Sequence, residues 1–179
     1  MDLDVAQLGQ VFTPPNVVAF MLDLCRNKGR VLEPSAGDGA FFDTLRQRGA
    51  EVVGIEIDQG VAPQGAQVGD FFAYPLDEQF DTIVSIGLLM FFDCATAQRM
   101  LARLEDHLRP GGTLIVNVLV EGTTYMEMFD PQGHCLFERD ALARRFAGWD
   151  VLLSSHADFP APGGLLKSFA TVIARKPAP

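Results

Sequence analysis

Cysteine, basic residues and long apolar runs are all scarce in this sequence, and each shortage excludes a class of protein. The three cysteines, Cys25, Cys94 and Cys135, are scattered and odd in number. We therefore expect neither a disulfide framework nor a paired-cysteine zinc site, and we interpret them as small buried side chains. No apolar run approaches the ~20 residues of a membrane span, and the N-terminal Met-Asp-Leu-Asp lacks the basic start of a signal peptide. We expect a soluble, cytoplasmic protein with no membrane partner and no metal.

The deficit of basic residues bears on partners. Lys and Arg number 14 against 23 Asp and Glu, which gives a net charge of -9. A phosphate backbone is repelled by such a surface, although a local basic patch can survive within it. We therefore do not expect a nucleic-acid partner, and the sequence leaves the oligomeric state open.

What the sequence has is an alternation of strand and helix patterns along its length. Its 179 residues, 48% of them apolar, predict one domain over residues 1–179. The first helix is expected to begin at Pro14 with Thr13 as its N-cap. We expect strands at residues 30–34, 51–57, 66–69, 80–85, 113–120, 150–155 and 168–175, and helices at residues 14–27, 40–48, 95–108 (closed by Pro110-Gly111-Gly112) and 138–147. This order predicts an α/β fold with a parallel sheet covered on both faces, and the last two strands suit an antiparallel edge hairpin.

One segment combines several features of a nucleoside site. The strand over residues 30–34 runs into a turn in which Gly37 and Gly39 flank Asp38, a helix follows near Ala40, and the next strand ends in Glu56. The glycines let the backbone turn sharply and approach a ligand, while the helix points its free N–H groups into the same space. Glu56 follows about twenty residues later, where an adjacent parallel strand presents an acid to ribose hydroxyls.

Charge decides which nucleoside fits this turn. A dinucleotide would place a doubly negative pyrophosphate beside Glu33 and Asp38, and these acids would repel it. S-adenosylmethionine carries instead an ammonium and a sulfonium, which acids attract, and one carboxylate that backbone N–H groups can accept. The sequence therefore favours S-adenosylmethionine over NAD as the cofactor.

These residues resemble the class I S-adenosylmethionine-dependent methyltransferases. The first motif of that family is matched by Glu33-Pro34-Ser35-Ala36-Gly37-Asp38-Gly39, and its ribose acid by Glu56. The resemblance implies a Rossmann-like sheet of seven strands, parallel except for an antiparallel edge hairpin, with helices on both faces. It also implies that the motif residues, Glu56 with its neighbour Ile57, and Ser85 at the end of the fourth strand line the cofactor site.

The N-terminal half also resembles the cofactor-binding part of adenine-N6 DNA methyltransferases. Phe12 and Thr13 lie in a Phe-Thr-Pro-Pro segment like the one that holds the methionine end of the cofactor in those enzymes. Asp70 and Phe71 match a segment whose acid accepts from the adenine amino group and whose aromatic ring packs on adenine. The resemblance implies a cofactor role for all four. The structural alternatives are a helix cap for Thr13, core packing for the two aromatics and a turn for Asp70.

After the fourth strand the chain departs from those DNA enzymes. Their Asn-Pro-Pro-Tyr segment accepts the adenine amino protons and stacks on a flipped base, and here it is replaced by Ile86-Gly87-Leu88-Leu89. None of these side chains can accept a hydrogen bond, and we find no second, basic domain to hold a duplex. We therefore do not expect methylation of adenine in DNA.

From residue 80 onward the chain is similar to the small methyltransferases of the tellurite-resistance type. The similar stretches are residues 80–85, 89–92, 109–116 and 169–176. That family carries a His-Arg pair and a further Arg before its Phe-Ala-Thr. Here His156 aligns with the His, but the arginine positions hold Ala157 and Ser168. Since these basic residues are missing, an oxyanion acceptor is not expected, and a neutral or thiol-bearing small molecule is favoured.

Two histidines are candidates for a general base. His134 lies within residues 122–137, a connection longer than the usual ~2–6 residues, which we expect to act as a lid. His156 is the second candidate. A surface loop for His134 and a polar strand end for His156 are the structural alternatives. Proximity alone suffices when the acceptor arrives deprotonated.

Aromatic residues on both sides of the expected lid suggest an apolar acceptor pocket. Phe91, Tyr125 and Phe129 are expected to bound it, although a core role fits them equally. On this interpretation the chain transfers a methyl group from S-adenosylmethionine to a small-molecule acceptor. The alternatives are an adenine-N6 nucleic-acid methyltransferase and a non-catalytic cofactor-binding subunit.

Overall fold

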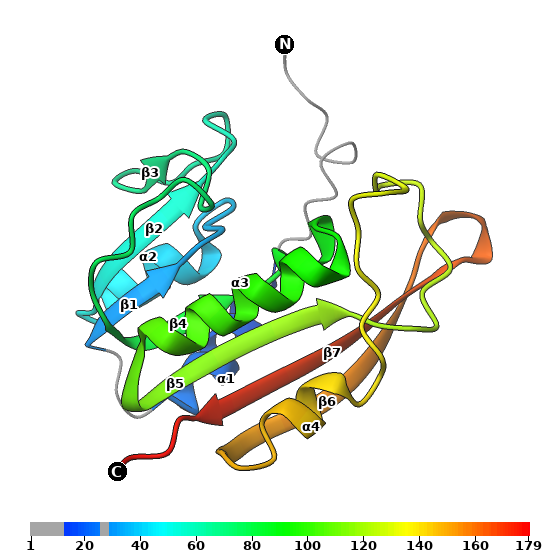
Figure 1. The fold of residues 1–179 in the computed structure, drawn as a ribbon. Coiled ribbons are helices and arrows are strands. Elements are labelled where there is room, and N and C mark those ends of the chain that lie inside the picture. Colours follow the sequence, from blue (N-terminus) through cyan, green and yellow to red (C-terminus); the bar gives the residue numbers. More distant parts are fainter. Residues whose placement is uncertain (1–12, 26–28) are drawn as a thin grey trace.

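A seven-stranded sheet in the order β3-β2-β1-β4-β5-β7-β6 organises the molecule (Figure 1). The structure, a computed structural model, describes residues 13–25 and 29–179. The strands are β1 (Arg30–Glu33), β2 (Glu51–Glu56), β3 (Gln67–Val68), β4 (Phe80–Ser85), β5 (Leu108–Leu119), β6 (Asp150–Pro160) and β7 (Leu166–Arg175). The helices are α1 (Pro15–Asp23), α2 (Ala40–Gln47), α3 (Cys94–His107) and α4 (Ala141–Arg145), with short 3-10 turns η1 (Leu89–Phe91) and η2 (Pro162–Gly164).

The direction of the strands places the ligand-binding edge. Strands β1 to β5 pair in parallel, and β7 is antiparallel to both β5 and β6. The predicted mixed sheet with an antiparallel edge hairpin is confirmed. Because the chain moves outward from β1 in one direction to β2 and β3 and in the other to β4 and β5, the strand order reverses at β1. Ligands of such sheets bind beyond the carboxyl ends of the strands at that reversal.

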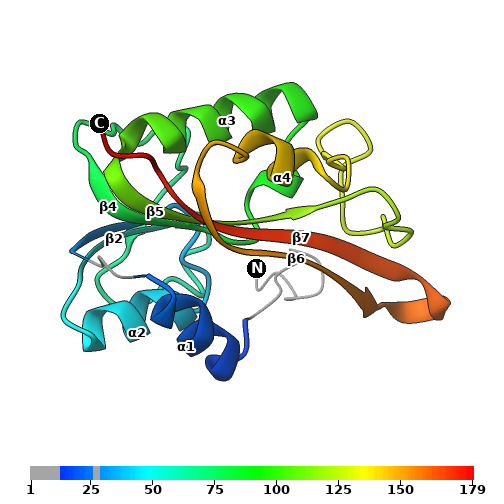
Figure 2. The ribbon, with the colours of Figure 1, turned by 90° about the horizontal axis from the view of Figure 1, so that it is seen from below.

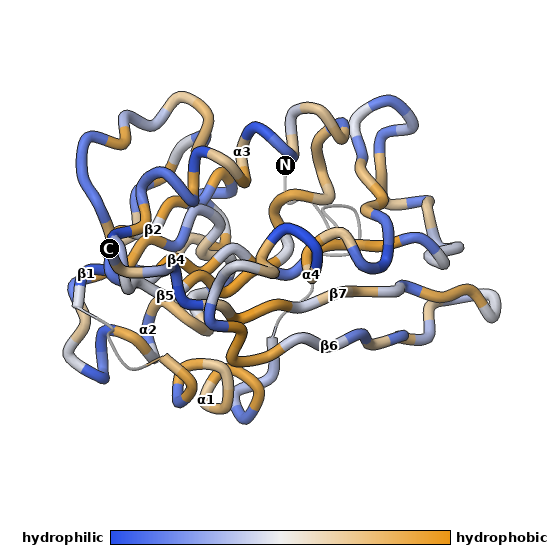
Figure 3. Tube along the Cα trace, turned by 60° about the horizontal axis from the view of Figure 1, so that its bottom comes forward, coloured by the Kyte–Doolittle hydropathy of each residue, from blue (hydrophilic) through white to orange (hydrophobic). Residues whose placement is uncertain are grey.

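Helices cover both faces of the sheet, with α3 and α4 on one and α1 and α2 on the other (Figure 2). Successive strand residues therefore enter opposite cores: Ile83 packs with the α3 and α4 side, whereas its neighbour Val84 packs with the α1 and α2 side. This double burial explains the continuous apolar colour of the inner strands, in contrast to the polar stretches of β6 (Figure 3).

The ends of the helices differ from the sequence prediction. Helix α1 begins at Pro15, its N-cap is Pro14, and that cap makes no side-chain hydrogen bond, so the prediction of Thr13 as the cap is wrong. Helix α1 ends at Asp23, before the expected residue 27, and residues 26–28 lie outside the described part of the chain. Helix α4 is confined to Ala141–Arg145, shorter than the predicted residues 138–147, and Phe137 just before that range is held in a bridge to Val120.

The fifth strand starts earlier than predicted. Residues 110–112 were expected to form a turn, but they lie within β5, where Phe80 faces Leu108 and Thr82 already faces Thr113. The extra residues form a bulge, with Gly111 at φ 76°. Backbone hydrogen bonds to Lys176 hold this bulge, at 3.0 Å from the Gly111 nitrogen and 2.8 Å to the Gly112 oxygen. Pairing with the C-terminal segment therefore overrides the local turn signal.

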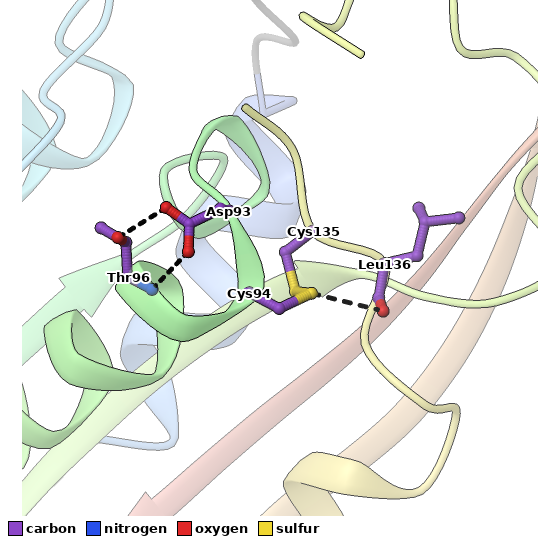
Figure 4. Close-up of a disulfide and its surroundings, with 5 residues drawn as sticks. All are labelled: Asp93, Cys94, Thr96, Cys135 and Leu136. Carbon is purple, nitrogen blue, oxygen red and sulfur yellow. Dashed lines mark hydrogen bonds between the residues drawn. A yellow bond between two sulfur atoms is a disulfide. The ribbon is translucent and has the colours of Figure 1, made fainter. Parts of the chain in front are cut away.

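Two cysteines form a disulfide, which corrects the expectation that all three are separate buried side chains. Cys94, the first residue of α3, is bonded to Cys135, 41 residues later, and their Cα atoms lie 4.6 Å apart (Figure 4). Cys25 takes no part in this disulfide and is buried, as expected. The pair was missed because scattered spacing says nothing about which residues tertiary folding brings together. Its effect is to tie the end of the 122–137 segment to the start of α3.

Two expected absences concern only the described part of the chain. None of its helices is both long and apolar enough to cross a bilayer. Within the same residues, no group of three or more His, Cys, Asp or Glu side chains is arranged to hold a metal ion.

Candidate cofactor and acceptor site

The turn between β1 and α2 is shaped by two glycines in left-handed conformations. Gly37 has φ 53° and Gly39, the N-cap of α2, has φ 91°. A Cβ at Gly39 would lie 2.8 Å from the Cβ of Pro63, so a side chain there would push the next loop away. A Cβ at Gly37 would meet nothing within 4 Å. The turn is therefore closely packed on one side and open on the other.

Glu56 at the end of β2 is fixed against this turn. Its Oε2 accepts a hydrogen bond of 2.7 Å from the Gly37 backbone nitrogen, and its Oε1 accepts one of 3.0 Å from the Asp58 nitrogen. The residue is only 6% exposed. Since a carboxylate has about four acceptor positions, two remain to receive hydroxyl groups. This arrangement suits the predicted ribose acid.

Glu33 at the end of β1 is a buried acid without a full set of partners. It is 3% exposed, and its Oε2 has no hydrogen-bond partner among the described residues. Burial, followed by the nearby charges of Glu56, Asp38 and Asp43, raises the pKa of the Glu33 carboxyl well above its usual range. An unpaired buried polar atom is costly. A bound cation at this point would relieve both the missing hydrogen bond and the repulsion between the acids.

A loop after β3 lies beside these acids. Its first residue, Gly69, donates from its backbone nitrogen to the backbone carbonyl oxygen of Glu56 at 2.8 Å. Asp70 Oδ1 accepts from the backbone nitrogen of Phe72 at 2.9 Å. Ile57, next to Glu56, is 71% exposed, as a residue that packs on a ligand ring can be. Phe71 is 4% exposed and belongs to the main core, which was the structural alternative for it.

Sequence reasoning passed over Phe72. It is 42% exposed, follows Asp70 and Phe71 directly, and its ring meets that of Phe92 edge-on at 4.9 Å between centroids. The alternation of buried Phe71 and exposed Phe72 could not be read from two adjacent identical residues. Phe72 rather than Phe71 is the aromatic side chain that this loop leaves accessible.

The ends of β1 and β4 are tied together next to the turn. Ser35 donates from Oγ to the Ile86 carbonyl oxygen at 3.1 Å. Ser85, at the end of β4, is fully buried, and its Oγ has no hydrogen-bond partner among the described residues. Thr13 is partly exposed immediately before α1, while Phe12 lies outside the described residues. Pro34 and Ala36 are buried in the turn itself.

An apolar cluster lies between η1, which follows β4, and the 122–137 segment. The Phe91 and Phe129 rings are 5.3 Å apart, and the Phe129 and His134 rings are 6.0 Å apart. Backbone nitrogen of Cys135 donates to the Met90 oxygen at 3.2 Å. His134 has its Nδ1 2.9 Å from the Asp130 oxygen. Three of the predicted acceptor-site residues, Phe91, Phe129 and His134, are thus brought together.

Tyr125 and His156 lie apart from that group. Tyr125 hydrogen bonds through its backbone nitrogen to the Leu166 oxygen at 3.1 Å, and the Lys167 amino group lies 5.1 Å from the centre of its ring. His156 is on β6, with Nε2 2.7 Å from the Arg139 oxygen. Three strand spacings separate β6 from β4 in the sheet, about 14 Å. Of the two histidines, His134 is the one whose ring lies in the cluster beside η1, the turn that follows β4.

Two cavities of about 310 Å³ and 270 Å³ lie between α3 and α4. They share Gln98, Phe137, Ala141 and Arg144 in their walls. Arg144 is paired with Glu138. Neither Glu33 nor Glu56, the acids at the ends of β1 and β2, lines either cavity. These cavities are away from the turn, so we locate the chemistry at the strand ends instead.

Comparisons with known proteins agree with this geometry. A family model described as a methyltransferase domain matches residues 12–153. Type II methyltransferase M.TthHB8I of Thermus thermophilus is 41% identical over 86 residues, which make up 43% of this chain and 20% of that protein. Type II methyltransferase M.HincII of Haemophilus influenzae is 37% identical over 81 residues, 43% of this chain and 16% of that protein. The alignment thus spans about a fifth or less of each relative.

Solved structures share the whole fold at low sequence identity. TehB from Haemophilus influenzae gives a TM-score of 0.72 at 17% identity, with 96% of this chain and 65% of that chain covered. The glycopeptide N-methyltransferase MtfA complexed with S-adenosyl-L-methionine gives 0.60 at 22% identity, with 94% and 100% covered. The predicted class I methyltransferase fold is confirmed.

Proposed function

The chain belongs to the family of methyltransferase domains, and on that premise we propose that it transfers a methyl group from S-adenosylmethionine to a small-molecule acceptor beneath residues 122–137. The observation that carries the proposal is the buried carboxylate of Glu33, whose Oε2 has no partner among the described residues, beside a glycine turn that Glu56 braces. A site of this shape needs a cation and offers hydroxyl acceptors, and the cofactor brings an ammonium and a ribose.

The described residues fit the cofactor part by part. Glu33 would receive the ammonium, since its Oε2 has no other described partner, and Glu56 would accept from the ribose hydroxyls. Asp70 would accept from the adenine amino group, with Ile57 against the ring. Bound S-adenosylmethionine supplies a methyl group already activated by its sulfonium.

The protein's own contribution at the acceptor end is to orient a nucleophile and exclude water. The cluster of Phe91, Phe129 and the partly buried methionines around them is apolar, which favours an uncharged or soft acceptor. Holding the nucleophile in line with the carbon–sulfur bond supplies roughly 7–11 kcal/mol. His134, at the edge of this cluster, would take a proton from an acceptor that arrives protonated, and His156 is the reserve candidate.

The segment after β4 supports a small acceptor over a base in DNA. Gly87 has φ 67°, Leu89 is fully buried in η1, and the Ile86 oxygen is taken by Ser35. No side chain of this segment can accept from an exocyclic amine. Although two relatives are named Type II methyltransferases, their similarity is confined to 43% of this chain.

Label transfer tests the proposal directly. The full chain is incubated with S-adenosylmethionine radiolabelled on its methyl group and a mixed panel of thiols, phenols, amines and oxyanions, with single-stranded and duplex DNA in a parallel reaction. We expect label in one small-molecule fraction, and Glu33→Gln is the matched control that should transfer little. Label on adenine in DNA would overturn the choice of acceptor, and absence of cofactor binding would overturn the site itself.

A further inference from the structure

We propose that Arg103, on α3, is a positioning residue that holds Asp70 in place to select adenine in the cofactor. The inference rests on the proposed function, because it assigns a purpose to Arg103 only if Asp70 meets the adenine amino group. Arg103 itself is too far along the chain, 33 residues after Asp70, for a sequence motif to connect the two.

The guanidinium of Arg103 contacts the loop that follows β3 at three points. Nη2 donates to the Tyr74 oxygen at 2.7 Å, and Nη1 donates to the Phe71 oxygen at 3.3 Å. The guanidinium carbon lies 5.1 Å from the centre of the Phe71 ring, a cation–π distance. One side chain therefore holds both ends of a four-residue turn that starts immediately after Asp70.

The loop's other anchors hold its side chains rather than these carbonyls: Phe71 is buried in the main core, Phe72 meets Phe92, and the Tyr74 hydroxyl accepts from Gln67 Nε2 at 3.0 Å. The structure gives it no strand pairing after β3, and its entry is fixed by the Gly69 bond to Glu56. Asp70 is exposed and orients its own loop through Oδ1, which accepts from Phe72. If the turn over residues 71–74 shifted, the nitrogen that holds Oδ1 would shift with it. The position of the Asp70 carboxylate thus depends on the contacts that Arg103 makes.

These contacts require an arginine. A planar guanidinium can donate to two carbonyls and lie over a ring at the same time, because its donors form a rigid fork. A lysine at residue 103 has three donors on one rotatable ammonium, but it has no planar group to lie over the Phe71 ring while it donates to the two carbonyls. Arg99, one turn earlier on the same helix, makes a different hydrogen bond. Its Nη2 donates to Thr96 Oγ1 at 2.8 Å, within the helix rather than to the loop. Arg99 is therefore a matched control.

The experiment compares two ligands that differ only at the base edge that carries the adenine amino group and N1. Calorimetry measures binding of S-adenosylhomocysteine and of S-inosylhomocysteine, which carries an oxygen in place of that amino group, to the wild type, Arg103→Ala, Arg103→Lys and Arg99→Ala. In the wild type we expect the adenosyl ligand to bind more tightly. Arg103→Ala should weaken the adenosyl ligand about ten- to hundredfold, the scale of a lost hydrogen bond to a charged group, and leave the inosyl ligand nearly unchanged.

Three results separate the possibilities. Arg103→Lys should recover part of the discrimination, Arg99→Ala should keep all of it, and in an Asp70→Ala background the Arg103 substitution should have no further effect on discrimination. Equal weakening of both ligands in Arg103→Ala and Arg103→Lys would reduce Arg103 to a structural residue and overturn the proposal. A wild type that binds both ligands equally would instead contradict the Asp70 assignment, and a wild type that binds neither would contradict the proposed function.

Discussion

The proposed cofactor end and the proposed acceptor end of this site are built in different ways. Apart from Asp70, the cofactor end comes mainly from one stretch, residues 33–58, in which hydrogen bonds lock charged groups against a glycine turn. The acceptor end draws on η1, residues 122–137 and the start of β7, which meet through apolar contacts and the Cys94–Cys135 disulfide. One end is polar and local, and the other is apolar and assembled from distant segments.

This difference indicates separate functions for the two ends. Directional bonds fix one ligand geometry, as an invariable cofactor requires. Apolar contacts are less directional and tolerate substitution, so the acceptor end can be adapted to a new acceptor without disturbing the cofactor end. Substitutions at the two ends should therefore affect different measurements, turnover in one case and cofactor affinity in the other.

The largest expected effect is at the acceptor end. Replacing His134 by Ala should lower turnover roughly 10²–10⁴-fold if it removes the acceptor's proton, with cofactor affinity unchanged because His134 contacts no residue of the cofactor turn. Turnover on the acceptor found by label transfer and calorimetry with S-adenosylhomocysteine measure the two quantities. His156→Ala, at the reserve candidate for the base, is measured in parallel. Normal turnover in both variants would leave proximity as the whole mechanism.

The next largest effect is expected from removing the disulfide, which also acts at the proposed acceptor end. The Cys94→Ser, Cys135→Ser double variant should lose about 2–4 kcal/mol of unfolding free energy, and amide exchange over residues 122–137 should rise, because this segment loses its covalent tie to α3. Cofactor affinity should not change. Denaturant unfolding and hydrogen exchange supply the measurements.

A reductant provides the control for that variant. It should reproduce the loss in the wild type and do nothing more to the double variant. An equally protected 122–137 segment with and without the disulfide would mean that apolar contacts alone hold this segment.

At the cofactor end, Glu56→Ala should weaken S-adenosylmethionine by about 1.5–3 kcal/mol, the scale of a lost hydrogen bond to a charged group. It removes the ribose acceptor and frees the Gly37 nitrogen. Exchange over residues 122–137 should stay the same. Calorimetry with S-adenosylmethionine and NAD checks both the loss and the expected failure of NAD to bind. Undiminished affinity in this variant would remove the ribose assignment.

The smallest expected effect is the release of a proton at Glu33. Burial raises its pKa in the folded state, so the free protein holds a proton there at pH values where the unfolded chain does not, and its stability falls as pH rises through the raised pKa. A bound ammonium favours the ionised form of Glu33 and lowers the pKa of its carboxyl, so binding releases that proton. Calorimetry in buffers of different ionisation enthalpy, from about pH 5 to about pH 8, detects the release.

Glu33→Gln is the control for that proton, because an amide cannot release one. The variant should bind more weakly with no proton change. Binding by the wild type without proton release across the whole range would contradict the pairing of Glu33 with the ammonium.

The reach of sequence reasoning follows the same division between the two ends. Strand β4 was predicted to the residue and β1, β2 and α2 within one residue, because buried strands and glycine turns depend on neighbouring residues. The bulge in β5 was missed because it depends on pairing with segments more than thirty residues away. The shortened α4, which follows the bridge between Val120 and Phe137, was missed as well. The same limit explains why Phe71, rather than Phe72, was placed at the ligand.

The sequence by itself determined the alternation of elements, the glycine turn and the acids at the ends of β1 and β2, because these are set by spacing within about twenty-five residues. Only the tertiary structure decided that Cys94 meets Cys135, that Tyr125 and His156 lie apart from His134, and that Arg103 reaches the Asp70 loop. Each of these depends on how strands and helices pack after the chain has turned back on itself, and a linear pattern carries no record of that packing.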